Sequence, residues 1–399
     1  MNQITTSGDS SFPSLDFPKV YIVVLNYNNW PDTLECLESL YSLNYQNFKV
    51  IVCDNGSQDL SLHHIQEWAD GVSEWVKPQN RIASERNRIV KKPISCSRFD
   101  IVQLGGMVHL ENLNQYSLLL IDNKENLGFA AGNNTGVRLA LKDSSLEYVW
   151  ILNNDTIVDP DALDHLVAKM TDRQLGACGN TILYYHNPCQ VQALGGFTYD
   201  TFFGVSRQIG HLHQWISERI GEDLEHYVES RMFGIQGASV FVRKDFLKTV
   251  GLMSEEYFLY FEEQDWAERS RRYFSLGYAS SAIVYHKEGR ATGSDSIEGR
   301  RKTPITDYYL SRNRLLFTRK YYPYRIVTAF MGNVLMGLKR LIHGHWPNTL
   351  VILLFSMVEM MGRGEQLPYK CNAQEFHQFI ERRFRLPFLK SVKRKILSM

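Results

Sequence analysis

The sequence is poor in cysteine and shows no cysteine pattern that would build a site. Its six cysteines are scattered through 399 residues, without a C-x-x-C pair or another spacing typical of a metal site: Cys36, Cys53, Cys96, Cys178, Cys189 and Cys371. This scatter excludes the disulfide framework of a small secreted domain. We therefore expect free thiols in a reducing compartment.

The chain also lacks an excess of charge, a secretion signal and a long hydrophobic run. Its 44 basic and 43 acidic residues leave a formal net charge of +1, which argues against nucleic acid as the main partner. Residues 1–17 are polar and predict a disordered lead-in without a signal peptide. The most apolar segment, 350–361, contains Glu359 and is shorter than the roughly 20 residues that cross a bilayer. A buried or interfacial helix is therefore expected there.

The first half of the sequence alternates apolar runs with helical patterns. Runs at 20–25, 48–53, 117–121 and 148–152 predict buried strands, and helices are expected from Pro31 and over 129–141. Repeated strand–helix units build a mostly parallel sheet flanked by helices, the α/β class. Because 399 residues exceed the usual size of one domain, we expect an α/β domain over 18–300 and a helical extension over 301–399.

Polar residues follow each of the four predicted strands. In order they are Asn26, Asp54, the segment 122–128, and Asn153 to Asp155. The carboxyl ends of parallel strands share one edge of a sheet, where open α/β sheets bind their ligands. An oxygen donor such as Asp155 suits a divalent cation that carries a diphosphate. A polar loop that caps the following helix explains residues 153–155 equally well at this point.

The second half is less regular and becomes helical after residue 300. It predicts a loop that enters a strand over 234–243, a helix over 244–250, an acidic segment at 261–265, and a strand that ends at His286. Helices are expected over 308–317 and 326–342, followed by the apolar segment described above.

Two basic segments have open interpretations. Residues 76–115 form a long insertion without a clear period, which is either a flap facing an acceptor or a membrane, or a tolerated surface insertion. Residues 382–395 are basic with apolar residues among them. A contact with a membrane surface and a solvated helix both fit this tail.

Six short stretches, taken together and in order, resemble glycosyltransferase family 2, the inverting nucleotide-sugar transferases with a GT-A fold. They are VLNYN at 24–28, VCDNGS at 52–57, NLGFAAGNN at 126–134, LNNDT at 152–156, FEEQD at 261–265, and His286. The resemblance covers residues 20–293 and is nearest to the rhamnosyltransferase-like branch. It implies a Rossmann-like sheet and transfer of a hexose or deoxyhexose, such as rhamnose, from a dTDP- or UDP-linked donor. The implied acceptor is a glycan or a lipid-linked sugar of cell-surface polysaccharide synthesis.

The resemblance assigns the nucleotide to the ends of the first two strands. Asn26 and Asp54 are expected to hydrogen-bond the base edge, with an Asx turn at Gly56 as the alternative for Asp54. Asn28 and Asn154 complete this part of the donor site.

The diphosphate is expected at the start of the helix over 129–141. Asn126 and Gly128 leave the backbone free to approach phosphate oxygens at a helix N-terminus. Asn133 is a further candidate donor contact, although we expect at least one of Asn133 and Asn134 on the helix surface.

Asp155 and His286 are the metal ligands that the resemblance implies, with Mg²⁺ or Mn²⁺ as cofactor. The ion would offset the charge of the departing nucleoside diphosphate. Asn153 stands where many relatives have the first aspartate of a D-x-D motif, and the missing charge should weaken metal affinity. Without the other motifs, His286 would be interpreted as a satisfied histidine at a strand end.

Glu262 and Glu263 are the candidate catalytic residues, since inversion needs a base for the acceptor hydroxyl. Glu263 occupies the position that the resemblance gives to the base. The adjacent like charges raise one pKa, and the N-terminus of the following helix partly opposes that rise. The structural alternative is a helix capped by Asp265, with the other acids exposed.

Three broader alternatives accompany these expectations. Arg312 and Arg314 either grip a diphosphate or lie on an exposed helix face. Asn153 and the glutamate at the base position keep open a nucleotide-sugar-binding protein without catalysis. A nucleotidyltransferase is disfavoured, because no Gly-rich, Lys-containing loop follows the first strand. We expect a cytoplasmic protein, with peripheral attachment to the cytoplasmic face of the inner membrane as one form.

Overall fold

The computed structural model describes residues 17–73, 90–100, 115–217, 221–287 and 303–362. The strands are β1 (Lys19–Asn26), β2 (Phe48–Asp54), β3 (Cys96–Asp100), β4 (Leu118–Asp122), β5 (Leu146–Asn153), β6 (Thr156–Val158), β7 (Leu175–Tyr184), β8 (Asn187–Leu194), β9 (Gly196–Asp200), β10 (Val205–Gln208), β11 (Gly234–Ile235), β12 (Ser239–Arg243) and β13 (Ser275–His286). The helices are α1 (Trp30–Leu40), α2 (Ser61–Asp70), α6 (Gly128–Ala140), α7 (Ala162–Lys169), α8 (Glu222–Glu229), α9 (Lys244–Thr249), α10 (Glu262–Ser270), α11 (Pro304–Tyr321), α12 (Ile326–Ile342) and α13 (Trp346–Met360).

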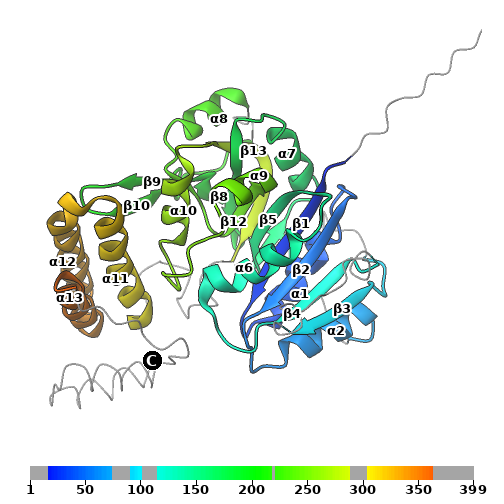
Figure 1. Ribbon diagram of the computed structural model, residues 1–399, viewed down its shortest axis with the longest axis horizontal. Coiled ribbons are helices and arrows are strands. Elements are labelled where there is room, and N and C mark those ends of the chain that lie inside the picture. Colours follow the sequence, from blue (N-terminus) through cyan, green and yellow to red (C-terminus); the bar gives the residue numbers. More distant parts are fainter. Residues whose placement is uncertain (1–16, 74–89, 101–114, 218–220, 288–302, 363–399) are drawn as a thin grey trace, which may run out of the picture.

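A mixed sheet runs through the molecule in the order β3-β4-β2-β1-β5-β12-β7-β13-β6, with β8 paired to β7 (Figure 1). The strands from β3 to β5 pair in parallel, as the repeated strand–helix units predict. β12 is antiparallel to both of its neighbours, while β13 returns to a parallel pairing with β7. A smaller sheet of β10, β9 and β11 lies beside the main one. The central sheet is therefore mostly parallel in its N-terminal half and mixed in its C-terminal half.

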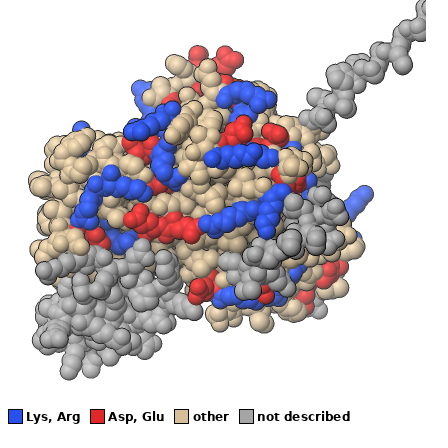
Figure 2. All heavy atoms as spheres, viewed as in Figure 1, with Lys and Arg blue, Asp and Glu red and all other residues tan. Residues whose placement is uncertain are grey.

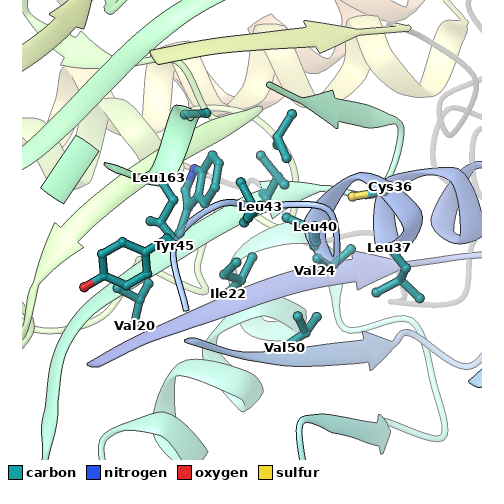
Figure 3. Close-up of a cluster of buried hydrophobic side chains, with 14 of the residues drawn as sticks. Val20, Ile22, Val24, Cys36, Leu37, Leu40, Leu43, Tyr45, Val50 and Leu163 are labelled. Carbon is teal, nitrogen blue, oxygen red and sulfur yellow. The ribbon is translucent and has the colours of Figure 1, made fainter. Parts of the chain in front are cut away.

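Hydrophobic cores cover both faces of this sheet. Along β1, Ile22 and Val24 face a core that includes side chains of α1, α2 and α7, part of which Figure 3 shows. The alternate residues Tyr21 and Val23 face a second core with α6, α9 and α10. Burial on both faces explains why these strands appear in the sequence as unbroken apolar runs.

Helix α6 packs closely against the second face through small residues. A side chain at Gly136 would lie 2.8 Å from both the Cys53 Sγ atom and a Val23 methyl group. This close approach fixes α6 against β1 and β2, and it brings the first turn of the helix to the carboxyl edge of the sheet.

Several elements differ from the sequence expectations. Between α7 and α8 the chain forms the strands β7 to β10, for which no strand was expected. Strand β3 falls inside the predicted insertion 76–115 and extends the sheet beyond β4, while most of that insertion lies outside the described residues. The basic tail 382–395 and residues 1–16 also lie outside them.

The helices predicted after residue 300 are present as α11, α12 and α13. Val351, Ile352 and Phe355 of α13 are buried, in agreement with a buried helix. Within the described ranges, none of the helices combines the length and apolar character needed to cross a bilayer. The five cysteines of these ranges are free thiols, as expected; Cys371 lies outside them.

Candidate functional site

The predicted site residues lie at neighbouring positions on one sheet edge. Asn26, the last residue of β1, is paired in register with Asp54, the last residue of β2. On the other side of β1, Leu25 is paired with Asn153 at the end of β5. The strand ends that the sequence marks with polar residues are therefore adjacent in space.

Asn26 connects these strand ends through a buried network. Its Nδ2 donates to the Asp54 Oδ1 at 2.6 Å and to the Ser57 Oγ at 3.2 Å. Its Oδ1 accepts from the Thr33 Oγ1 at 2.8 Å and from the Asn154 Nδ2 at 3.3 Å. Asn26 is fully buried. Its amide therefore holds the ends of β1 and β2 and residue Asn154 together by hydrogen bonds from within the fold.

Asp54 and Asn28 hold the loops that follow β2 and β1. The Asp54 carboxylate accepts the Ser57 backbone N–H at 2.9 Å and the Ser57 hydroxyl at 2.6 Å. This is the turn that was the structural alternative for Asp54. Asn28 is exposed, and its Oδ1 accepts the Gln58 backbone N–H at 2.7 Å. Of these two residues, Asn28 is the one with a solvent-facing position.

A chain of amides joins the loops after β2 and β4. The Asn55 Nδ2 donates to the Asn126 Oδ1 at 3.2 Å and to the Gly128 carbonyl oxygen at 3.0 Å. The Asn123 Nδ2 donates to the Asn55 Oδ1 at 3.0 Å. Asn55 and Asn123 were not among the sequence candidates, although each directly follows a strand-end aspartate. They orient Asn126 and the first turn of α6.

Gly128 has a left-handed φ of +84° and contacts a protein loop. A side chain there would overlap the carbonyl oxygen of Phe258. That oxygen also accepts the Phe129 backbone N–H at 2.7 Å. The close approach at Gly128 in this structure is therefore made by the loop that precedes α10.

Asn133 and Asn134 are both buried, so the expectation that one of them lies on the helix surface is wrong. The Asn134 Nδ2 donates to the Met253 carbonyl oxygen at 2.9 Å and to the Glu255 Oε1 at 2.9 Å. The Asn133 Nδ2 donates to the Phe129 carbonyl oxygen at 3.0 Å. The segment before α10 covers the side of α6 that a simple strand–helix unit would leave open.

Asp155 and His286 meet across 131 positions of sequence. The His286 Nε2 lies 3.0 Å from the Asp155 Oδ1, and both side chains are buried. β13 brings His286 there by pairing it with Thr156 of β6. The second ring nitrogen, Nδ1, is 2.8 Å from the Gln192 Oε1 on β8. Gln192 thereby orients the ring so that Nε2 faces Asp155.

The pair has the spacing of two neighbouring ligands on a small divalent ion. Such ions hold nitrogen and oxygen ligands at about 2.0–2.1 Å, which places adjacent ligands about 3 Å apart. Burial alone would raise the pKa of Asp155, but the charge of His286 and its hydrogen bond outweigh burial and lower that pKa. In the described ranges no three His, Cys, Asp or Glu side chains gather as a metal site. Asp155 and His286 therefore fit as two protein ligands of a divalent ion. The other ligands of the ion would come from the donor or from water.

Lys287 holds the chain directly after His286 and was missed by the sequence reasoning. Its Nζ lies 2.5 Å from the Asp32 Oδ1 and 2.5 Å from the Glu35 Oε2, both on α1. All three side chains are buried. Its backbone N–H also donates to the Asp155 carbonyl oxygen at 3.0 Å. No local sequence pattern predicts this cluster, because Lys287 is about 250 positions away from both of its partners in the sequence.

Glu262 and Glu263 begin α10, and burial disfavours the charge of their carboxylates. Glu262 is buried, and its Oε2 has no hydrogen-bond partner among the described residues. Burial, followed by the charge of Glu263, raises the pKa of Glu262 well above its ordinary value. Glu263 is partly exposed, and burial raises its pKa to about 7. Burial therefore disfavours a negative charge on both carboxyls.

The structural alternative for this acidic segment is wrong. Phe261, and not Asp265, is at the N-cap, and no side chain caps the helix. Asp265 is fully buried and accepts from Arg269, Lys320 and Tyr321 at 2.6 to 2.8 Å. Burial would raise the pKa of Asp265, but these three partners lower it. Asp265 is an anchor for α10.

Glu263 and Asp155 belong to one region, connected through residues 237–238. The Glu263 Oε1 occupies the space that a side chain at Gly237 would fill. The next residue, Ala238, accepts the Asn153 backbone N–H at 3.0 Å. Two consecutive residues thus link the glutamate to the strand end that carries Asp155.

Arg312 and Arg314 are buried, so the exposed-face interpretation is wrong. The Arg314 Nε donates to the Gly204 carbonyl oxygen at 3.0 Å, and its Nη1 donates to the Asn333 Oδ1 at 2.7 Å. Arg312 donates to the Asn313 Oδ1 at 2.6 Å. Its Nε also lies 3.6 Å from the Glu359 Oε1 of α13, so both arginines join α11 to other segments.

Comparison with known proteins identifies the family to which the chain belongs. The family model described as Glycosyl transferase family 2 matches residues 21–92 and 109–249, more than half of the chain. The protein belongs to glycosyltransferase family 2. The predicted family is therefore confirmed, and so is the fold class, a mixed α/β fold with a mostly parallel sheet flanked by helices. The rhamnosyltransferase-like branch stays a prediction.

This glycosyltransferase is also similar to solved structures at low identity. The mannosyltransferase PcManGT from Pyrobaculum calidifontis, in complex with GDP-Man and Mn2+, is 12% identical with a TM-score of 0.46, over 86% of this chain and 88% of that one. S. aureus TarS 1-349 is 14% identical with a TM-score of 0.40, over 88% and 94%. GalNAc-T7 with UDP, GalNAc and Mn2+ is 12% identical with a TM-score of 0.45, over 75% and 51%. No curated protein matches the chain.

The stability of the glycosyltransferase should depend on pH through Glu263. Its pKa is raised to about 7 in the fold, so the free energy of unfolding falls as the pH rises from the unfolded pKa of about 4.3 to about 7, and this penalty is constant above pH 7. We expect Glu263→Gln to raise the free energy of unfolding at pH 8 by about 2 kcal/mol, allowing for partial exposure, and to lose this gain as the pH falls to 5. Urea unfolding at both pH values measures it.

The control for this measurement is Glu222→Gln on the exposed first turn of α8. It should change the free energy of unfolding equally little at both pH values. A gain for Glu263→Gln that is the same at pH 5 and pH 8 would contradict the raised pKa.

Proposed function

We propose that this glycosyltransferase inverts the anomeric centre of the sugar it transfers. The donor is a dTDP- or UDP-linked hexose or deoxyhexose, such as rhamnose, and the acceptor is a glycan or lipid-linked sugar in cell-surface polysaccharide synthesis. One observation carries the proposal: Glu263, with its pKa raised to about 7, contacts Gly237, and the next residue, Ala238, hydrogen-bonds Asn153, two positions before Asp155 of the buried Asp155–His286 pair. A base and a phosphate-facing pair at one sheet edge are what the transfer requires.

In the proposed reaction, Glu263 accepts a proton from the acceptor hydroxyl. The hydroxyl oxygen forms a bond to the anomeric carbon while the bond from that carbon to the diphosphate oxygen breaks on the opposite face, so the configuration inverts. A pKa of about 7 suits this role, because the carboxylate is available near neutral pH and still a competent base. Burial, followed by the charge of Glu263, also raises the pKa of the neighbouring Glu262, which disfavours a second negative charge beside the base.

A Mg²⁺ or Mn²⁺ ion held by Asp155 and His286 would supply charge neutralisation for the departing diphosphate. Gln192 keeps the His286 ring oriented, and Lys287 anchors the chain beside it. In the proposed donor site, Asn28 faces the base, while Asn26, Asp54 and Asn154 brace the loops behind it. Asn126, Gly128 and Asn133 order the start of α6 for the diphosphate.

A binding protein without catalysis is the second candidate, favoured by Asn153 at the first position of the metal motif. Donor turnover distinguishes the two candidates. Wild-type protein with Mn²⁺ should hydrolyse or transfer the correct sugar from a panel of nucleotide sugars. Binding of the nucleotide sugar without any turnover would support the second candidate.

Glu263→Gln should abolish transfer and keep nucleotide binding. Loss of the base is expected to lower kcat by about 10³-fold, within the range for general base catalysis. The rate of the wild type should fall below pH 7, because protonated Glu263 cannot accept a proton. Steady-state kinetics across pH 5.5–8.5, with calorimetry for the nucleotide, measure both effects. Full activity of the variant would remove Glu263 from the chemistry.

Asp155→Ala and His286→Ala should each remove the metal-dependent part of donor binding. For the wild type, EDTA should raise the dissociation constant of the donor by at least about tenfold. Both variants should bind the donor weakly with or without EDTA. Asp161→Ala, at an exposed position before α7, serves as a control that keeps the response to EDTA. Equal EDTA responses in the wild type and both variants would place the metal elsewhere.

We also propose peripheral attachment to anionic membrane, where a lipid-linked acceptor would be presented. An apolar row runs along α12, with exposed fractions between 48 and 82%: Val327, Met331, Leu335, Leu338 and Ile342. At the left edge of Figure 2, over α12, the surface is mostly uncharged. No acidic residue occurs from 326 to 358, and the chain beyond the described residues is rich in Lys and Arg. Apolar rows beside basic segments suit membrane surfaces.

Leu335→Glu combined with Leu338→Glu should reduce binding to vesicles that contain phosphatidylglycerol. The expected loss is at least about tenfold, because two buried leucine contacts with lipid are replaced by charges of the same sign as the surface. Val72→Glu, on an exposed loop after α2, is the matched control. Co-sedimentation measures the bound fraction. Unchanged binding of the double variant, or no binding by the wild type, would contradict the proposed attachment.

A further inference from the structure

The loop that leads into the two glutamates has a backbone that its own residues disfavour. Phe258, Tyr260 and Phe261 have φ angles of 65°, 67° and 79°. This left-handed region is rarely adopted by residues with bulky side chains. Such a backbone persists only where the surrounding structure holds it in place. Because the loop ends directly before Glu262, the groups that hold it also set the position of Glu263.

Asn313 of α11 holds this loop. It is fully buried, and its Nδ2 donates to the carbonyl oxygens of Tyr257, Leu259 and Tyr260, each at 2.9 Å. The Asn313 Oδ1 accepts from the Arg312 Nη1 at 2.6 Å. A guanidinium can only donate, so this contact fixes the amide with its N–H groups toward the loop.

The same helix also holds the chain on the far side of the glutamates. Asp265, two positions after Glu263, accepts from the Lys320 Nζ at 2.8 Å and the Tyr321 Oη at 2.7 Å, at the end of α11. Tyr257, at the start of the loop, donates to Asp265 at 3.1 Å. The two glutamates therefore lie between two points of attachment to one helix.

The loop also reaches the turn that precedes α6. The Phe258 carbonyl oxygen accepts the Phe129 backbone N–H, and it fills the space beside Gly128. Moving this loop would therefore disturb Glu263 and the start of α6 together.

We propose that Asn313 is a positioning residue for Glu263, so that α11 is part of the catalytic unit of this enzyme. The inference rests on the proposed role of Glu263 as base. Asn313 acts through the three carbonyl groups that it holds, and it has no contact with the reacting atoms. The purely structural alternative is that Asn313 stabilises only the packing of α11.

Asn313→Ala and Asn333→Ala form a matched pair for testing this. Asn333 is equally buried in the same helical layer, but its Nδ2 donates to the Ser311 carbonyl oxygen and the Ser356 hydroxyl, away from the loop. Both variants should lower the melting temperature. We expect only Asn313→Ala to lower kcat, by about a hundredfold, the scale reported for small misplacements of catalytic groups. The donor KM should rise by much less than kcat falls, since the loop meets α6 only at its first turn and the nucleotide loops after β1 and β2 are untouched.

Two further readouts separate positioning from stability. Hydrogen exchange of the amides at 257–265 should accelerate in Asn313→Ala and stay unchanged in Asn333→Ala. The acid limb of the pH–rate profile should move to lower pH in Asn313→Ala, because a loosened Glu263 becomes better solvated. Asn313→Asp, which keeps the shape and the Arg312 contact but removes both donors, replaces Asn313→Ala if the alanine variant does not fold.

The outcomes are distinct for the inference and for the proposed function. Equal losses of kcat in the two alanine variants, or unchanged exchange at 257–265 in Asn313→Ala, would overturn the positioning role. A wild type without donor turnover would overturn the proposed function. In that case the exchange experiment would still decide whether Asn313 holds the loop.

Discussion

The parallel pairing of β1 with β2 on one side and β5 on the other determines how the polar strand ends of the site lie relative to one another. It places Asn26 beside Asp54 and Leu25 beside Asn153. Both faces of β1 are buried, so a slip of one residue would exchange the side chains of the two cores. The register is therefore fixed by packing on both faces. The same packing fixes which polar residues lie side by side at the strand ends.

The local features of this site are predictable from the sequence, and its long-range contacts are not. Strand-end polarity correctly located the shared edge, and the resemblance paired Asp155 with His286, which the structure brings to 3.0 Å. The strands β7 to β10 were missed because they follow one another without helices between them, so they lack the repeated strand–helix pattern. Lys287 and Asn313 were missed for another reason. Their partners lie more than 50 positions away, so no spacing in the sequence connects them.

The acidic start of α10 shows a conflict between stability and chemistry. Burial disfavours charge on both glutamates, as the raised pKa values of Glu262 and Glu263 indicate. Asp265, three positions after Glu262, is also buried, but cationic and hydroxyl partners keep it ionised. The same helix thus carries acids in two electrostatic states, and the difference comes from their partners. A buried carboxyl oxygen without a partner, such as the Glu262 Oε2, is costly for folding, and such groups are typical of functional sites.

The meeting of Asp155 with His286 has a consequence for synthesis of the protein. A chain that leaves the ribosome from its N-terminus can form the nucleotide loops after β1 and β2 early, because their strands lie within the first 54 residues. His286 follows more than 130 residues after Asp155, and Asn313 later still. The proposed machinery is thus completed only when most of the chain has been made. With the proposed roles, a polypeptide that ends before residue 286 lacks both the second metal ligand and the residue that holds the loop before Glu262.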